Sequence, residues 1–182
     1  MNRPSKHPNF SAVENNPEGL MEDEKIPKKE AMQQMKNMIS RTALLHSAFT
    51  QTLIEELGEK KGKALALKAI KRYGGFVGQK ARKRAEEKGL PFTRENFQDD
   101  LPSLGWHNRE RIVVDGENRA RVHTCYLAET WKELGVPEVG RLYCFVDQAK
   151  YETFNPDLEC VHTKNVLDGD PFCELAVRQR KK

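Results

Sequence analysis

The spacing of apolar residues changes near residue 106, and this change limits the folds that the chain can adopt. Between about Lys28 and Lys88, apolar residues recur every three or four positions, as they do in amphipathic helices. After residue 106, short β-prone runs alternate with turn sequences that contain Gly, Asp or Pro. Helices that precede strands predict an α+β domain, in which an N-terminal helical half packs on a small, mainly antiparallel sheet in the C-terminal half.

The 182 residues are enough for one compact domain and a tail. Residues 1–27 mix Pro, Asn, Glu and Lys without periodicity, which predicts a disordered or loosely docked tail. Residues 28–182 are then expected to form a single domain. Its helical half covers 28–105, and its strand-rich half covers 106–182 and carries the site.

The helical half is expected to contain three helices. The first covers about 28–57, stops at Gly58, and has an apolar stripe made of Met32, Met35, Ile39, Thr42, Leu45, Phe49 and Leu53. The second covers about 60–73 and the third 79–88, with YGGFVG between them. The paired glycines in this motif either kink a helix or let another backbone approach closely.

The strand-rich half is expected to begin with a hairpin, because an Asp-Gly turn at Asp115 divides the β-prone stretch from Glu110 to Cys125. A short helix follows over Tyr126–Gly135. Strands are predicted at 141–147, 158–167 and 171–178, with at least one helical turn at 148–154. The Asp-Gly-Asp-Pro sequence at 168–171 predicts the turn between the last two strands.

Several classes of protein are disfavoured by composition. No run approaches the roughly 20 apolar residues that span a bilayer, and no apolar signal region begins the sequence, so we expect a cytoplasmic protein with reduced thiols and no membrane partner. The net charge of +4 is only mildly basic. The basic stretch from Lys60 to Lys88 contains few aromatic residues, so it is predicted to be a solvated helix face and not a nucleic-acid site.

The predicted strands place all four cysteines and two histidines on one face of the sheet. Side chains alternate between the two faces of a strand, so residues two positions apart share a face. The residues expected on the shared face are Arg119, Arg121, His123, Cys125, Leu142, Cys144, Val146, Leu158, Cys160, His162, Cys173, Leu175 and Val177. The N-terminal helices are expected to cover this face, which would enclose the thiols in one sheltered hollow.

Three explanations of this cluster compete: a metal site, an inert core and a catalytic pocket. A zinc site is disfavoured because the sequence has no C-x₂-C or H-x₃-H pair, only His123-x-Cys125 and Cys160-x-His162. Buried cysteines also occur simply as small apolar groups. A catalytic pocket requires a thiolate beside a cation or a hydrogen-bond donor, or a carboxylate that activates water.

The sequence offers candidates for each part of such a pocket. Cys144 and Asp147 are three residues apart at the end of a predicted strand, and Asp170 precedes Cys173 in a turn. Arg119 and Arg121 are candidates to bind a substrate carboxylate through forked hydrogen bonds. Each residue also has a structural explanation: a core position for Cys144, a helix cap for Asp147, a turn for Asp170 and solvation for the two arginines.

The segment HTCYLAETWKELGVPEVGRLYCFVDQAKYETFNPDLECVHTKNVLDGDPFCEL resembles the L-2-amino-thiazoline-4-carboxylic acid hydrolase family. The resemblance rests on Cys125, on LG-P--G-LYC--D from Leu134 to Asp147, on FNPDL from Phe154 to Leu158, and on GD--C from Gly169 to Cys173. The helical half matches only in general character.

The family implies that water attacks the ring carbon between sulfur and nitrogen. The sulfur leaves as a thiol, which gives N-carbamoyl-L-cysteine on the route to L-cysteine. The candidate catalytic residues are Cys144, Asp147, Cys173, Cys125, His123 and Asp170. The candidate substrate-binding residues are Arg119, Arg121, Asn155 and His162. Thiolate attack and carboxylate-activated water both remain open as mechanisms.

A weaker similarity connects Cys144, Asp147 and a later strand cysteine with organomercurial lyase, in which paired cysteines and an aspartate cleave a carbon–metal bond. The alternative function is therefore a thiol-based binding or lyase module for a thiophilic metal or organometal. We expect a small-molecule substrate and no nucleic-acid partner. The sequence shows no cofactor requirement, and it leaves a divalent metal and a homo-oligomer open.

Overall fold

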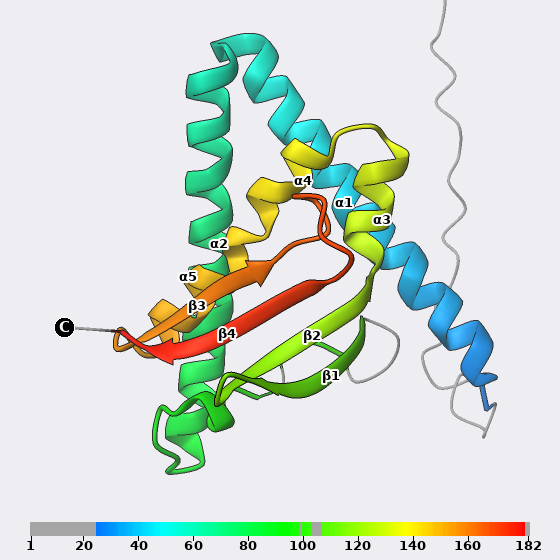
Figure 1. Cartoon of the computed structure of the whole chain (residues 1–182). Coiled ribbons are helices and arrows are strands. Elements are labelled where there is room, and N and C mark those ends of the chain that lie inside the picture. Colours follow the sequence, from blue (N-terminus) through cyan, green and yellow to red (C-terminus); the bar gives the residue numbers. More distant parts are fainter. Residues whose placement is uncertain (1–24, 99, 103–106, 181–182) are drawn as a thin grey trace, which may run out of the picture.

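The computed structural model describes residues 25–98, 100–102 and 107–180, with the side chain of His107 excepted (Figure 1). Nearly all of the predicted tail over 1–27 lies outside these residues. The described chain has the predicted α+β class: two long helices come first, and a four-stranded antiparallel sheet lies in the C-terminal half. Among the described residues, every helix is too short or too polar to cross a bilayer.

Two antiparallel helices, α1 (Lys28–Leu57) and α2 (Glu59–Glu87), form the N-terminal half. The chain turns between them at Gly58, whose φ of 76° favours glycine. The predicted break at YGGFVG is wrong, because α2 runs through this motif without interruption. A short 3₁₀ helix, η2 (Arg94–Asn96), follows α2.

The glycines of YGGFVG do not kink the helix. They allow the close approach of a second backbone, which is the other role expected for them. Gly74 and Gly78 are buried against helix α5 (Phe145–Phe154). A Cβ atom added at Gly74 would lie 2.7 Å from the Ala149 Cβ atom, and one added at Gly78 would collide with the carbonyl oxygen of Lys150. The absence of two side chains on α2 therefore lets α5 lie directly against it.

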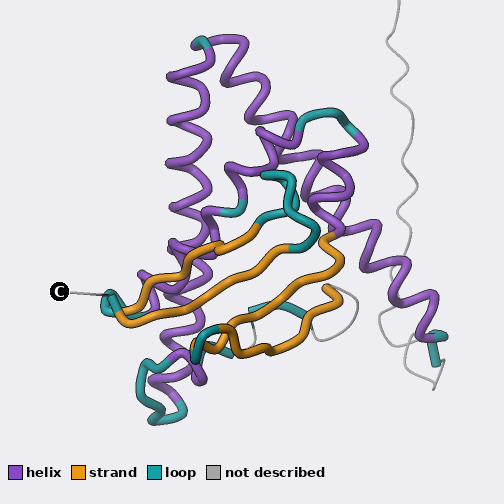
Figure 2. The backbone as a smooth tube through the Cα atoms, viewed as in Figure 1, coloured by secondary structure: helices purple, strands orange, loops and turns teal. Residues whose placement is uncertain are grey.

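All four strands of the described residues lie in the second half of the chain. The hairpin of β1 (His107–Val114) and β2 (Glu117–Cys125) turns at Asp115 and Gly116, which have φ values of 51° and 77°. Three helices follow: α3 (Tyr126–Glu133), α4 (Pro137–Tyr143) and α5. The chain ends with β3 (Leu158–Lys164) and β4 (Cys173–Gln179), and the sheet order is β1-β2-β4-β3 (Figure 2).

The strand predicted at residues 141–147 is wrong. This segment forms the end of α4, a junction at Cys144 and the first turn of α5. Pro137 occupies the start of α4, where its fixed φ and missing N–H are tolerated. The alternation of Leu142, Cys144 and Val146 that suggested a strand is coincidental.

The helices lie together on one side of the sheet (Figure 1). One buried cluster joins α1, α3 and α4 and consists of Ile39, Ala43, Leu127, Trp131 and Tyr143. The Trp131 indole N–H donates a hydrogen bond of 3.1 Å to the Ala43 carbonyl, which fixes α3 on α1. A second cluster joins α2, α5 and β3 and consists of Ala81, Ala85, Phe154 and Leu158. Leu127, Trp131 and Tyr143 of the first cluster also line the cavity described below.

Candidate functional site

A cavity of about 100 Å³ lies between the helices and the inner face of the sheet. Its walls are mainly apolar and include Val122 and Leu175 from the sheet and Trp131 from α3. Its polar or ionisable lining residues are Tyr73, Asp100, Cys125, Tyr143, Cys144, Asp147, Lys150, His162, Asn165 and Cys173. One water molecule needs roughly 10–15 Å³ of cavity volume, so this cavity accommodates several waters or a small ring compound.

Asp147 lies at the centre of the charged groups in this cavity. It belongs to the first turn of α5, where the helix dipole favours a negative charge. Its Oδ1 atom is 2.7 Å from the Lys150 ammonium one turn later, and that ammonium also donates a 2.5 Å hydrogen bond to Asp100. One buried cation therefore holds two carboxylates at the cavity wall.

The positive charge of Lys150 is maintained by these carboxylates. Lys150 is only 8% exposed. Burial lowers the pKa of Lys150, but Asp147 and Asp100 raise it by more, so its pKa lies above the ordinary value. Lys150 therefore remains charged and serves to position Asp147.

His162 approaches Asp147 from strand β3. Its Nε2 atom is 3.5 Å from Asp147 Oδ2, which is too long for a strong hydrogen bond. Burial lowers the pKa of His162, and the neighbouring Asp147 offsets only part of this effect. The imidazole is therefore neutral at pH 7 and can accept a proton.

Three of the four cysteines line the cavity, namely Cys125, Cys144 and Cys173. Burial raises the pKa of Cys125 to about 11 and that of Cys144 to about 12, and it also raises the pKa of Cys173. Cys160 is buried on the same face of the sheet, outside the cavity lining. These groups are thiols at neutral pH, and this state favours carboxylate-activated water over thiolate attack.

Arg119, Arg121 and His123 do not lie in the cavity, so the predicted placement on the thiol face is wrong for them. Strand β2 pairs Arg121 with Glu174 of β4, and cross-strand partners share a face. The cavity residue Val122 pairs with Cys173 on the opposite face. Cys125 reaches the cavity because β2 ends there and α3 begins, after an irregularity in the pairing with β1.

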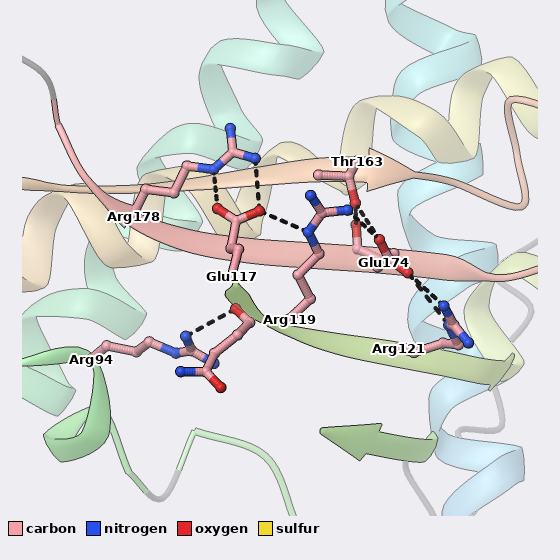
Figure 3. A network of polar contacts seen from close by, with 8 residues as sticks. Arg94, Glu117, Arg119, Arg121, Thr163, Glu174 and Arg178 are labelled. Carbon is pink, nitrogen blue, oxygen red and sulfur yellow. Dashed lines mark hydrogen bonds and ion pairs between the residues drawn. The ribbon is translucent and has the colours of Figure 1, made fainter. Parts of the chain in front are cut away.

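The outer face of the sheet is covered by a network of ion pairs (Figure 3). Arg119 and Arg121 lie 2.7 and 3.0 Å from the two carboxylate oxygens of Glu174, which is 2% exposed. Burial raises the pKa of Glu174, but hydrogen bonds from the two arginines and Thr163 outweigh it, so the pKa is lowered. His123 pairs with Glu110 at 3.0 Å on the same face. The two arginines are thus held by a protein carboxylate.

Asp170 and Asn155 hold loops in place. The Asp170 carboxylate accepts a 2.8 Å hydrogen bond from the Asn165 N–H and so shapes the turn before Cys173. The Asn155 side chain donates to the Phe92 carbonyl at 2.8 Å and accepts from the Asp157 N–H at 2.9 Å. Both lie outside the cavity lining. Asp170 acts on it indirectly, through Asn165.

Sequence reasoning missed Asp100 and Lys150. The D-x-x-K spacing of Asp147 and Lys150 would have predicted an ion pair had residues 145–154 been assigned to one helix. Asp100 meets them from a distant segment, and its sequence context carries no comparable signal. Within the described ranges, no group of three or more His, Cys, Asp or Glu side chains has the geometry to hold a metal ion.

Comparisons with known proteins agree with the sequence resemblance and extend it. The model of the L-2-amino-thiazoline-4-carboxylic acid hydrolase family matches residues 36–177 and so includes the helical half. A comparison with curated proteins finds no significant match. A crystal structure of trafficking protein particle complex subunit 3 from Naegleria fowleri, covalently bound to palmitic acid, superposes with a TM-score of 0.50. It is 14% identical over 80% of this chain and 97% of that one, which indicates a similar fold only.

Proposed function

This chain belongs to the L-2-amino-thiazoline-4-carboxylic acid hydrolase family, and from this premise we propose that it hydrolyses the thiazoline ring of that acid to N-carbamoyl-L-cysteine. The observation that carries the proposal is the position of Asp147 in the cavity, between the Lys150 ammonium and the neutral His162 imidazole. A carboxylate beside a neutral imidazole is an arrangement that activates water.

The substrate's amidine fits the charges of this cavity. The lining contains two carboxylates, Asp100 and Asp147, and one ammonium, Lys150, which leaves one net negative charge when His162 is neutral. A protonated amidine carries one positive charge. Coulomb attraction in a partly desolvated cavity therefore favours the amidinium end of the ring next to Asp147.

Ring opening of the protonated amidine consumes one water molecule: one of its protons ends on the departing sulfur, and the other is released to solvent when the carbonyl group of the product forms. Water held by Asp147 and His162 loses a proton to this pair, and its oxygen forms a bond to the ring carbon between sulfur and nitrogen. The carbon–sulfur bond breaks, and the proton passes from the imidazolium to the departing sulfur. The product is a urea with a free thiol.

In this mechanism the cavity thiols contact the substrate ring and do not transfer protons. With pKa values of about 11 and 12, Cys125 and Cys144 hold their protons more tightly than an imidazolium does, so they are poor acids for the leaving sulfur. They are small, polarisable groups that pack against the ring.

The test is turnover of L-2-amino-thiazoline-4-carboxylic acid by purified protein, followed by release of the product thiol. We expect Asp147→Asn to lower kcat by roughly 100-fold or more, the usual effect of losing a general base. We expect the double variant Cys144→Ser, Cys173→Ser to keep kcat within about tenfold of the parent, because neither thiol takes part in proton transfer in this mechanism.

Asp157→Asn is the matched control for loss of an aspartate, since Asp157 is exposed and lies outside the cavity. Folding of each variant is checked by thermal unfolding. Unchanged turnover in Asp147→Asn would contradict the water-activation mechanism. Binding of the acid without any turnover would contradict the proposed hydrolase function and favour a binding module.

A further inference from the structure

A second, larger groove adjoins the cavity. It has a volume of about 360 Å³ and lies along α2, where it is lined by Phe76, Lys80, Ala81 and Arg84. Tyr73, Val77 and Asp100 line both the groove and the inner cavity. The groove and the cavity are therefore neighbouring parts of one binding region, with Val77 at the junction.

The charges of the two parts are opposite. The inner cavity carries one net negative charge from Asp100, Asp147 and Lys150. The groove adds the Lys80 ammonium, and its carboxylate, Asp100, is already paired with Lys150. A ligand with a cationic end and an anionic end would consequently enter with the cationic end first.

Helix geometry gives the spacing of the two cations along α2. At a rise of 1.5 Å per residue, Lys80 lies about 4.5 Å along α2 from Val77, and Arg84 lies about 10.5 Å along it. A carboxylate attached to a five-membered ring in the cavity would project towards the groove, where the long Lys80 side chain can reach it. Arg84 lies one turn further out, where it would meet a longer anionic group.

We propose that this groove is the carboxylate subsite of the enzyme, with Lys80 as the main contact and Arg84 as a second cation for larger acidic substituents. The assignment rests on the proposed function for the identity of the ring, and it replaces Arg119 and Arg121, which are held by Glu174 on the other face of the sheet. The exposed rings of Tyr73 and Phe76 supply the apolar walls of the groove.

Lys83 on the same helix serves as the control, because it belongs to the solvated basic face of α2 and not to the groove. Lys83 is next to Arg84 in sequence, its side chain is 76% exposed, and it pairs with Glu87 at 3.8 Å. It does not line the groove. Lys80→Gln and Lys83→Gln therefore make the same change in net charge, but only the first removes a groove cation.

The experiment compares the thiazoline acid with 2-amino-2-thiazoline, which has the ring but no carboxylate. Lys80→Gln is expected to raise KM for the acid by about 10- to 100-fold, with little change in kcat and no loss of affinity for the ring that lacks the carboxylate. Lys80→Arg should restore most of the affinity for the acid. Arg84→Gln should have a smaller effect, and Lys83→Gln none.

Calorimetric binding of the same two compounds separates this proposal from the proposed function. Protein that binds the acid without hydrolysing it would overturn the hydrolase proposal, while a weaker Kd in Lys80→Gln alone would still support the subsite. Three results would overturn the subsite: equal losses for the acid and for the ring without a carboxylate, equal losses in Lys80→Gln and Lys83→Gln, or no binding of the acid by the parent protein.

Discussion

Lys150 shows how one residue can organise a site without reacting. Its ammonium is 2.7 Å from Asp147 and 2.5 Å from Asp100, and these contacts orient both carboxylates in a largely apolar cavity. Two carboxylates without this cation would repel each other, and one of them would take up a proton. Lys150 is thus a positioning residue that keeps Asp147 available as a base.

His162 gives a prediction at the residue scale about pH. Burial holds its pKa below the ordinary value of 6.5, and only the neutral imidazole accepts a proton from water. Activity should therefore be full at pH 7 and should fall as the pH drops through the pKa of His162, which places the acid limb of kcat/KM below pH 6.5. We expect His162→Gln to lower kcat by about 100-fold or more and to remove this limb.

The measurement is kcat/KM between pH 4.5 and 8 for the parent and the variant, because this quantity reports groups of the free enzyme. His123→Gln is a suitable control, since His123 lies on the outer face beside Glu110. An acid limb that persists in His162→Gln would assign the titration to another group.

The packing of α5 on α2 matters most at the element scale, because α5 carries both Asp147 and Lys150. Gly78 contacts the backbone of Lys150 directly, and a methyl group there would push α5 away from α2. We expect Gly78→Ala to cost about 1–3 kcal/mol of unfolding free energy through overpacking and to lower kcat by displacing the two residues. Denaturant unfolding and turnover of the same samples test this.

Gly75 supplies the control within the same motif. The nearest atom to an added Cβ there is the Thr153 Oγ1 atom at 3.6 Å, an ordinary contact. Gly75→Ala should therefore be neutral or should stabilise α2 by up to about 1 kcal/mol through its higher helix propensity. Equal effects of the two substitutions would contradict a role for Gly78 in seating α5.

The elements that the sequence predicted well are those set by local signals. The stop at Gly58, the Asp115-Gly116 hairpin and the strand containing Cys173 each depend on nearby residues, and the structure contains all three. The segment 141–147 was mistaken for a strand because a short apolar alternation also fits a helix buried on two sides. Val139, Gly140 and Tyr143 in α4 are all buried, and tertiary packing decides between the two patterns.

The candidate site was predicted in part. Cys125, Cys144, Asp147, His162 and Cys173 do meet at one cavity. Arg119 and Arg121 were placed on the wrong side because the position of Cys125 was used to set the face of the whole of β2, although the chain turns into α3 at that residue. Asp100 joins the site through long-range folding, which periodicity does not report.

At the scale of the whole molecule, the sheet separates two electrostatic environments. Strand β4 contributes Cys173 and Leu175 to the cavity and Glu174 to the outer network. The outer network therefore holds β2 and β4 in the register that places Val122 opposite Cys173. Loss of the network should affect the cavity, although none of its residues lines it.

Glu174 tests this connection. Removing one partner of a buried ion pair leaves uncompensated charge, so we expect Glu174→Ala to cost about 3 kcal/mol, at the low end of the usual range because Arg119 and Arg121 retain some contact with water. Glu117→Ala, which removes a more exposed carboxylate of the same network, should cost less. Denaturant unfolding gives both values, and KM for the acid reports any change in the cavity.

The same carboxylates determine how the protein responds to acid. The pKa of Glu174 is lowered, and hydrogen bonds from Arg178 and Arg119 lower the pKa of Glu117 to about 2. A carboxylate with a depressed pKa stabilises the folded state above its unfolded pKa of about 4.5, and this contribution is lost as the pH falls towards the folded value. Stability should therefore decrease from about pH 5 to pH 2, and the decrease should be smaller in Glu117→Gln. Glu117 joins β2 to Arg178 of β4. If the free energy of unfolding depends on pH in the same way in Glu117→Gln and in the parent protein, the outer network does not control acid unfolding.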